Sequence, residues 1–179
     1  MSCVKGAIAI SMLVIDEAKE VSDSEKLRRA CRSGAKWFYW IAGLSVVNSI
    51  LQLAGGAISF VIGLAITQVI AAIARGVTEG AEPGLARAVR LLAFVLALAL
   101  AGLFVWCGWH ASRQRGWAFV TGMLVYGLDG LLCLLFGDWM SFSFHVFALF
   151  FVWAGYSSMR KLHAIEAQTG VRPIEPGGA

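Results

Sequence analysis

Charged residues are scarce in this sequence, and their scarcity argues against a soluble domain. Asp, Glu, Lys and Arg make up 15% of the 179 residues, whereas soluble domains average about 25%. Hydrophobic residues make up 59%, and the mean hydropathy is +0.74. The short alternating runs of a membrane β-barrel are also lacking. The sequence therefore predicts a membrane protein built from helices, because a spanning segment must satisfy its own backbone hydrogen bonds.

Motifs that carry chemistry are lacking as well. The sequence contains no P-loop, no dinucleotide fingerprint and no zinc-binding helix motif. The four cysteines, Cys3, Cys31, Cys107 and Cys133, form no CxxC pair and have no metal-ligand spacing. Cys107 and Cys133 lie within apolar runs, where a thiol packs as a small apolar group. We therefore expect no catalytic site, no metal and no cofactor.

The basic residues lie beside the apolar runs and do not form a nucleic-acid surface, although the net charge is +4. Arg28, Arg29, Arg32 and Lys36 precede the first run, and Arg160 and Lys161 follow the last. This placement is typical of helix anchoring and of contact with anionic head groups. The expected partner is the lipid bilayer, together with either further copies of the chain or a membrane complex.

Five apolar runs are long enough to cross the ~30 Å hydrocarbon layer. They cover residues 37–54, 58–74, 88–109, 117–136 and 140–159. Trp37, Trp109, Trp117 and Trp139 lie at run ends, as expected of residues that favour the water–lipid interface. The predicted fold is an all-α bundle of five transmembrane helices over residues 37–159. A polar or amphipathic segment (1–36) precedes it, and a short helical extension with a disordered tail (160–179) follows.

Five crossings would place the two termini on opposite sides of the membrane. With the N-terminus in the cytoplasm, the inside flanks carry eight basic residues and the outside flanks five. Because basic residues are retained in cytoplasmic loops, this difference predicts a cytoplasmic N-terminus.

Small and polar residues recur within the runs. Two ladders at four-residue spacing are expected to pack inside the bundle, with docking of another subunit as the alternative: Ser59, Gly63, Thr67 and Ala71, then Ala93, Ala97 and Ala101. Asn48 and Gln52 share a face of the first run, and Gln68 lies on the second at about the depth of Ser45. These side chains are expected to bond across a hairpin turned by Gly55-Gly56; alternatively, the amides line a polar path for a solute.

Asp129 is the residue that most needs explaining, because an ionised carboxylate inside a bilayer costs about 2.5–3.5 kcal/mol. Tyr126 shares its helix face, and His145 on the next run differs from it in depth by about 6 Å. Three roles are open: a neutral structural hydrogen-bonder, a group that moves protons or cations, and a contact with a partner's cationic residue.

The sequence gives little support for an intramembrane hydrolase or protease. Ser141 and His145 lie four residues apart, but no glycine elbow and no third orienting residue accompany them. Asp138 lies nine residues from Asp129, too far along the chain for an aspartyl-protease pair. The sequence predicts a small protein that moves a proton, ion or small solute through a polar centre at Asp129 and His145. The alternative is a structural or accessory subunit of a membrane complex.

Two stretches resemble a group of small, uncharacterised bacterial integral membrane proteins. They are residues 37–45 (WFYWIAGLS) and 122–130 (GMLVYGLDG), with Asp138, Trp139 and His145 after the second. The resemblance covers roughly residues 28–160 and implies a multi-pass protein of the bacterial inner membrane. It implies no activity and adds no site residue.

Overall fold

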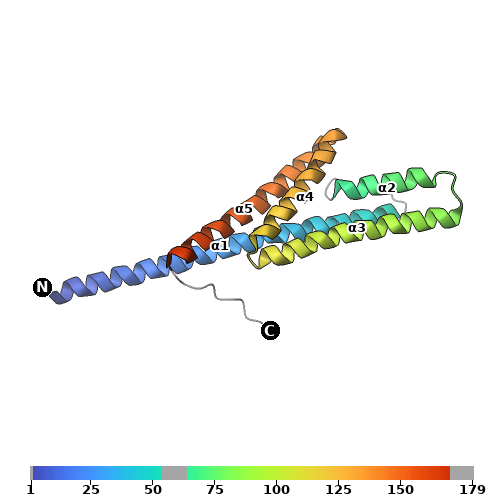
Figure 1. Cartoon of the computed structure of the whole chain (residues 1–179). Coiled ribbons are helices and arrows are strands. Elements are labelled where there is room, and N and C mark those ends of the chain that lie inside the picture. The colour runs from blue at the N-terminus through green and yellow to red at the C-terminus, as the bar shows by residue number, and fades with distance from the viewer. Residues whose placement is uncertain (1, 54–63, 170–179) are drawn as a thin grey trace.

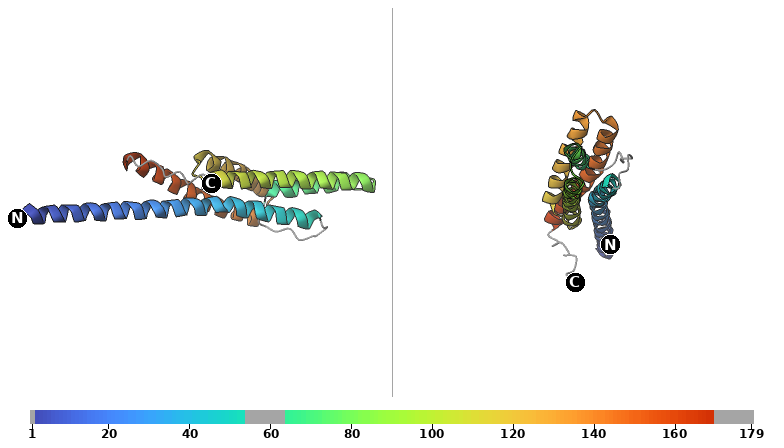
Figure 2. Two further views of the ribbon diagram at one scale, coloured as in Figure 1. Left: turned by 90° about the horizontal axis from the view of Figure 1, so that it is seen from below. Right: turned by 90° about the vertical axis from the view of Figure 1, so that its right-hand side faces the viewer.

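The computed structural model describes residues 2–53 and 64–169, with side chains from residue 18 onward except Gln52. This part of the chain forms five α-helices: α1 (Ser2–Leu53), α2 (Ala65–Thr78), α3 (Pro83–Ser112), α4 (Gly116–Leu135) and α5 (Trp139–Thr169). In Figure 1, α1 and α3 run side by side, while α4 and α5 pair and rise away at an angle. The short α2 lies against α3. Figure 2 shows the N-terminal part of α1 extending beyond the other helices.

The turns after α3 and α4 follow from the backbone hydrogen bonds that end those helices. After α4, Gly137 has a φ of 72°, and the N–H groups of Gly137 and Asp138 donate to the carbonyls of Leu134 and Cys133. This is the Schellman arrangement, which satisfies carbonyls that the helix end leaves free. After α3, Gln114 takes the same left-handed position with a φ of 60°. Both turns are short, so α3, α4 and α5 are successive antiparallel neighbours.

The structure confirms an all-helical fold, but the prediction of five spanning helices was wrong. Three described helices are long and apolar enough to cross a membrane: α3, α4 and α5, which contain most or all of the last three predicted runs. The described helix α2 has 14 residues, about 21 Å, less than the ~30 Å layer. The run at 37–54 forms the end of α1, where Asn48 and neighbouring serines lower the hydropathy. Residues 54–63, with Gly55-Gly56, lie outside the described residues.

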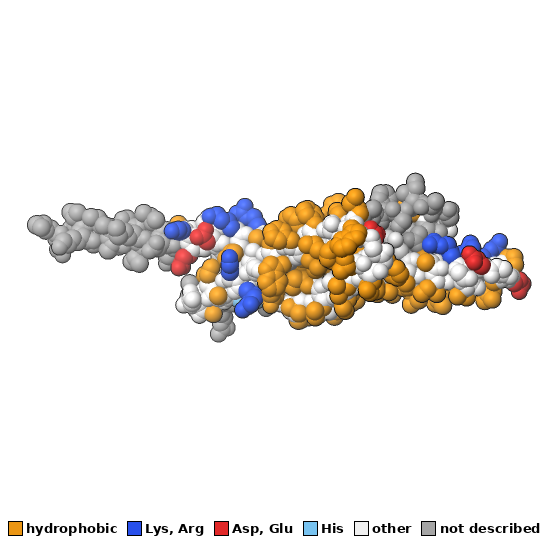
Figure 3. Space-filling view, turned by 90° about the horizontal axis from the view of Figure 1, so that it is seen from above, with side chains coloured by type: hydrophobic (Ala, Val, Ile, Leu, Met, Phe, Trp, Pro, Cys, Tyr) orange, Lys and Arg blue, Asp and Glu red, His pale blue; other side chains and the backbone are white. Residues whose placement is uncertain are grey.

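Apolar side chains cover much of the outside of this protein as well as its interior, and several polar side chains are buried. Buried side chains between the helices include Ser45, Asn48, Thr67, Asp129 and His145. The exposed faces of α3, α4 and α5 carry leucine, valine, phenylalanine and tryptophan in long rows. Figure 3 shows these apolar side chains as a belt, with basic side chains gathered at two places on either side of it. Such a surface is suited to lipid contact, since a soluble monomer rarely exposes so large an apolar patch.

Phe38 of α1 forms the centre of the packed interior. Its ring lies 6.2 Å from that of Phe104 on α3 and 6.1 Å from that of Phe119 on α4, centroid to centroid. Gly122 on α4 makes room for it, because a Cβ at that position would overlap the Phe38 ring. Phe104 in turn lies 6.0 Å from Tyr126, so a continuous row of rings joins α1 to the polar centre described below.

α1 and α5 cross at two glycines. A Cβ added to Gly34 would lie 2.6 Å from the Cα of Gly155, and the reverse distance is 2.7 Å. Beyond the crossing, Arg28 donates to Glu166 at 2.8 Å. The polar flanks of α1 and α5 therefore lie together at one end of the belt.

We expect Gly34→Ala to destabilise the protein and Gly43→Ala to leave it unchanged or slightly more stable. The new methyl at position 34 would meet backbone of α5, and overpacking of this kind costs about 1–3 kcal/mol. Gly43 lies on the same helix with no atom within 4 Å of an added Cβ, so it is the matched control. Thermal unfolding in detergent measures both variants. Equal melting temperatures would show that the helices do not cross at these glycines.

Candidate functional site

Asp129 binds the beginning of another helix. Its Oδ2 accepts the backbone N–H of Ala65 at 2.7 Å, and its Oδ1 accepts that of Ile66 at 2.8 Å. These residues are the first two of α2, while Asp129 is on α4. A carboxylate at this position also faces the positive end of the helix dipole. Asp129 is 3% exposed, so both hydrogen bonds lie inside the protein.

The remaining N–H groups at the start of α2 are also satisfied. Ser45 Oγ on α1 accepts the N–H of Leu64 at 3.0 Å. The N–H and the hydroxyl of Thr67 donate to the Leu64 carbonyl at 3.2 and 2.6 Å. Every N–H from Leu64 to Thr67 therefore has an acceptor, which accounts for the donors that a helix start leaves free. Two other helices supply the cap, because the position before α2 is a leucine with no capping side chain.

His145 on α5 completes the centre at Oδ2 of Asp129, the oxygen that also accepts the N–H of Ala65. Its Nε2 lies 2.9 Å from Asp129 Oδ2, and its Nδ1 lies 2.7 Å from the carbonyl oxygen of Ser141. The ring of Tyr126 stacks on the imidazole, with centroids 4.3 Å apart and planes at 22°. Gly130 lets α4 approach, since a Cβ there would lie 3.0 Å from His145 Cβ.

The hydrogen bonds fix how many protons the pair holds. The Ser141 carbonyl can only accept, so Nδ1 of His145 carries a proton. The contact between Nε2 and Oδ2 then needs one more proton, on either atom. With it on Nε2 the pair is imidazolium and carboxylate; with it on Oδ2 both groups are neutral. In either arrangement, one proton lies between Asp129 and His145 and the pair has no net charge.

Asp138 fixes the start of α5 and hence the position of His145. Its Oδ1 accepts the backbone N–H of Ser141 at 3.1 Å, and its Oδ2 accepts the Ser141 hydroxyl. The hydroxyl bond, followed by the backbone bond, lowers the pKa of the Asp138 carboxyl from its usual value. The geometry is that of a helix N-cap. Ser141 is thus a capping partner whose carbonyl orients the histidine one turn later.

The structure brings some of the predicted site residues together and leaves others apart. Asp129, His145 and Tyr126 form one cluster, in which the Tyr126 hydroxyl is buried and has no hydrogen-bond partner among the described residues. Asn48 is buried on α1. The Gln68 side chain is half-buried and makes no hydrogen bond to a described residue. The hydroxyl of Ser45, which was expected to lie at the depth of Gln68, instead accepts the backbone N–H of Leu64. The side chain of Gln52 is outside the described part.

The predicted small-residue ladders are placed only in part. Ser59 and Gly63 lie outside the described residues. Thr67, Ala97 and Ala101 are buried, and Ala71 and Ala93 are half-buried beside one cavity. The described members therefore face protein or that cavity.

Sequence reasoning missed the backbone partners of Asp129. The available signal was the lack of Ser, Thr, Asp or Asn just before Ala65, which leaves a helix start in need of an outside acceptor. It also missed His110, whose ring lies 4.7 to 5.0 Å from the rings of Trp106, Trp109 and Trp117 at the end of α3.

Comparison of the chain with protein-family models, with curated proteins and with solved structures gave no match. The functional argument therefore depends on the geometry of this chain alone.

We expect Asp129→Asn to destabilise the protein by about 1–3 kcal/mol, the cost of leaving a buried donor unpaired. The amide offers one acceptor oxygen where the carboxylate has two, so its NH₂ would leave the N–H of either Ala65 or Ile66 without an acceptor. Asp138→Asn is the matched control, because Asn is about as good an N-cap as Asp. Thermal unfolding in detergent should separate the two. A drop in Asp138→Asn as large as that in Asp129→Asn would contradict the capping of α2 by Asp129.

Proposed function

We propose that this chain is a multi-pass membrane protein that moves a proton, an ion or a small solute through a polar centre at Asp129 and His145. Three candidate spans and the buried pair support the proposal. The observation that carries it is the direct contact, at 2.9 Å, between the buried carboxylate of Asp129 and the buried imidazole of His145. Carboxylates within membrane segments often belong to proton or ion paths. Short helices that begin inside the protein are a recurrent feature of transporter sites.

The contacts of Asp129 suggest how protonation would be coupled to movement. A second proton on the pair leaves Asp129 neutral and His145 cationic. The neutral acid is a weaker acceptor for the N–H groups of Ala65 and Ile66 and no longer offsets the helix dipole. The start of α2 is then held less tightly. In this mechanism α2 is the moving element, and the free Tyr126 hydroxyl is a donor for the transported species.

We further propose four crossings, made by residues 37–53 of α1 and by α3, α4 and α5, with α2 entering from one side only. The Arg28–Glu166 ion pair supports this arrangement, because it joins the residues before the proposed first crossing to those after the last. Cys31 Sγ lies 4.0 Å from the Ala111 carbonyl, which puts the α3–α4 turn at that same end.

The basic residues orient this arrangement. The end where α1 begins its crossing and α5 ends carries ten described ones: Lys19, Lys26, Arg28, Arg29, Arg32, Lys36, Arg113, Arg115, Arg160 and Lys161. The opposite end carries three: Arg75, Arg87 and Arg90. A difference of ten to three favours a cytoplasmic location for both termini. With the bacterial resemblance, the proposed location is the inner membrane.

Reporter fusions after residue 169 and before residue 18, with a third in the turn at 79–82, test this topology. We expect the two terminal reporters in the cytoplasm and the third on the opposite side, because Arg28 and Glu166 lie together. Terminal reporters on opposite sides would contradict the four-crossing arrangement.

Flux measurements in liposomes test the polar centre. We expect His145→Gln to lower pH-driven dye quenching at least tenfold, because glutamine cannot hold the shared proton, while Asp129 still caps α2. Asp138→Asn should retain flux, since Asp138 lies at a helix cap outside the pair. Equal flux in wild type, His145→Gln and empty liposomes would reject proton movement through this centre.

One observation favours a structural or accessory subunit as the second candidate. Both oxygens of Asp129 already have donors from this chain, so the centre is satisfied without any transported species. Absence of flux together with stoichiometric co-purification of a second membrane protein would support this role. A stable homo-oligomer with flux would support transport.

A further inference from the structure

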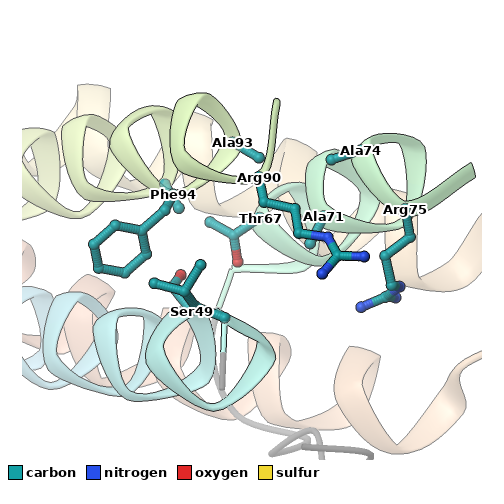
Figure 4. Close-up of a pocket in the computed structure, with 10 residues that line it drawn as sticks. Ser49, Thr67, Ala71, Ala74, Arg75, Arg90, Ala93 and Phe94 are labelled. Carbon is teal, nitrogen blue, oxygen red and sulfur yellow. The ribbon is translucent and has the colours of Figure 1, made fainter. Parts of the chain in front are cut away.

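A cavity of about 180 Å³ opens between the end of α1, α2 and α3, away from the Asp129 pair. Much of its wall is small and apolar, with Ala71 and Ala74 on α2 and Ala93, Ala97 and Phe94 on α3. Figure 4 shows Arg75 and Arg90 extending at one end of it. The cavity thus combines an apolar interior with a cationic edge.

The two arginines have no described partner that would neutralise them. Arg75 comes from α2 and Arg90 from α3, and both are exposed; neither guanidinium group has an ion pair or hydrogen bond to a described residue. The nearby Glu79 and Glu82 form no ion pair within the described residues either. Residues 54–63 contain no acidic side chain in their sequence. Two guanidinium groups are therefore available to an external anion.

The hydroxyl groups that line the cavity already have hydrogen-bond partners within the protein. The Ser49 hydroxyl donates to the Ser45 carbonyl at 2.8 Å, and the Thr67 hydroxyl donates to the Leu64 carbonyl at 2.6 Å. Both donors are used within the protein. The part of a ligand that lies inside the cavity, past the two arginines at its edge, therefore needs only to be apolar.

We infer that this cavity is a binding site for an anionic phospholipid, with the phosphate between Arg75 and Arg90 and part of an acyl chain against the alanines. Guanidinium groups pair well with phosphate oxygens in charge-assisted hydrogen bonds. Apolar cavities of about 150 Å³ accept a benzene-sized group, so 180 Å³ holds a segment of a chain and not a whole lipid. Figure 3 shows basic side chains gathered beside the apolar belt, where head groups meet hydrocarbon in the proposed arrangement.

Native mass spectrometry of the detergent-solubilised full chain, titrated with dioleoyl phosphatidylglycerol or phosphatidylcholine, tests the site. We expect the first phosphatidylglycerol to bind more tightly than the first phosphatidylcholine. Arg75→Ala with Arg90→Ala should weaken it about 25-fold, from about 1 kcal/mol for each basic residue at an anionic surface. Arg87→Ala is the matched control, because Arg87 lies one turn from Arg90 and does not line the cavity. It should change the affinity less than twofold.

Two further measurements separate the lipid from a free anion and from general surface charge. Ala93→Leu fills the cavity while keeping both arginines, so it should weaken phosphatidylglycerol binding at least fivefold. Inorganic phosphate at millimolar concentration should not displace the lipid. Displacement by phosphate, or unchanged affinity in Ala93→Leu, would overturn the lipid site. An equal loss in Arg87→Ala would show that surface charge alone attracts the lipid. Unchanged circular dichroism shows that each variant is folded.

Discussion

A helix that begins inside an apolar bundle needs acceptors for its first N–H groups, and the centre of this structure is organised around that need. An unsatisfied backbone donor in hydrocarbon costs several kcal/mol. Water at a membrane surface would meet the need for most helices, but α2 begins between α1 and α4. Ser45 and Asp129 therefore supply the cap from other parts of the chain. The burial of Asp129 follows from this constraint before any transport role is considered.

The same carboxylate connects backbone capping to proton chemistry. The carboxylate of Asp129 joins the start of α2 to His145, because it accepts backbone N–H groups of α2 and contacts the imidazole of α5. His145 is in turn fixed by the Ser141 carbonyl and by the stacked ring of Tyr126. These groups come from three helices, α2, α4 and α5, so the pair lies where all three meet. In the proposed mechanism, a change in protonation at the pair would act on the cap of α2 directly.

Hydropathy was sufficient to predict an all-helical protein and the positions of α3, α4 and α5, because length and composition alone define such helices. Hydropathy was insufficient for α2. The apolar run at 58–74 predicted a full membrane span, but the described helix begins at Ala65. Depth counted from the turn at Trp139 predicted that Asp129 and His145 lie near each other, and the structure shows them in contact. The backbone partners of Asp129 were not predictable from side-chain patterns, since Ala65 and Ile66 contribute only N–H groups. The number of crossings depends on tertiary contacts such as Arg28 with Glu166, which no local pattern contains.

The cap on α2 also sets an order of events during synthesis. Asp129 lies 64 residues after Ala65, so at about 5–20 residues per second the ribosome adds it roughly 3–13 s later. During that interval the start of α2 lacks the acceptor that it has in the finished protein. In the proposed membrane arrangement, lipid alone offers no substitute for this acceptor. The start of α2 can bind Asp129 only after α4 has been made. Burial of this helix start therefore depends on a part of the chain that is synthesised later.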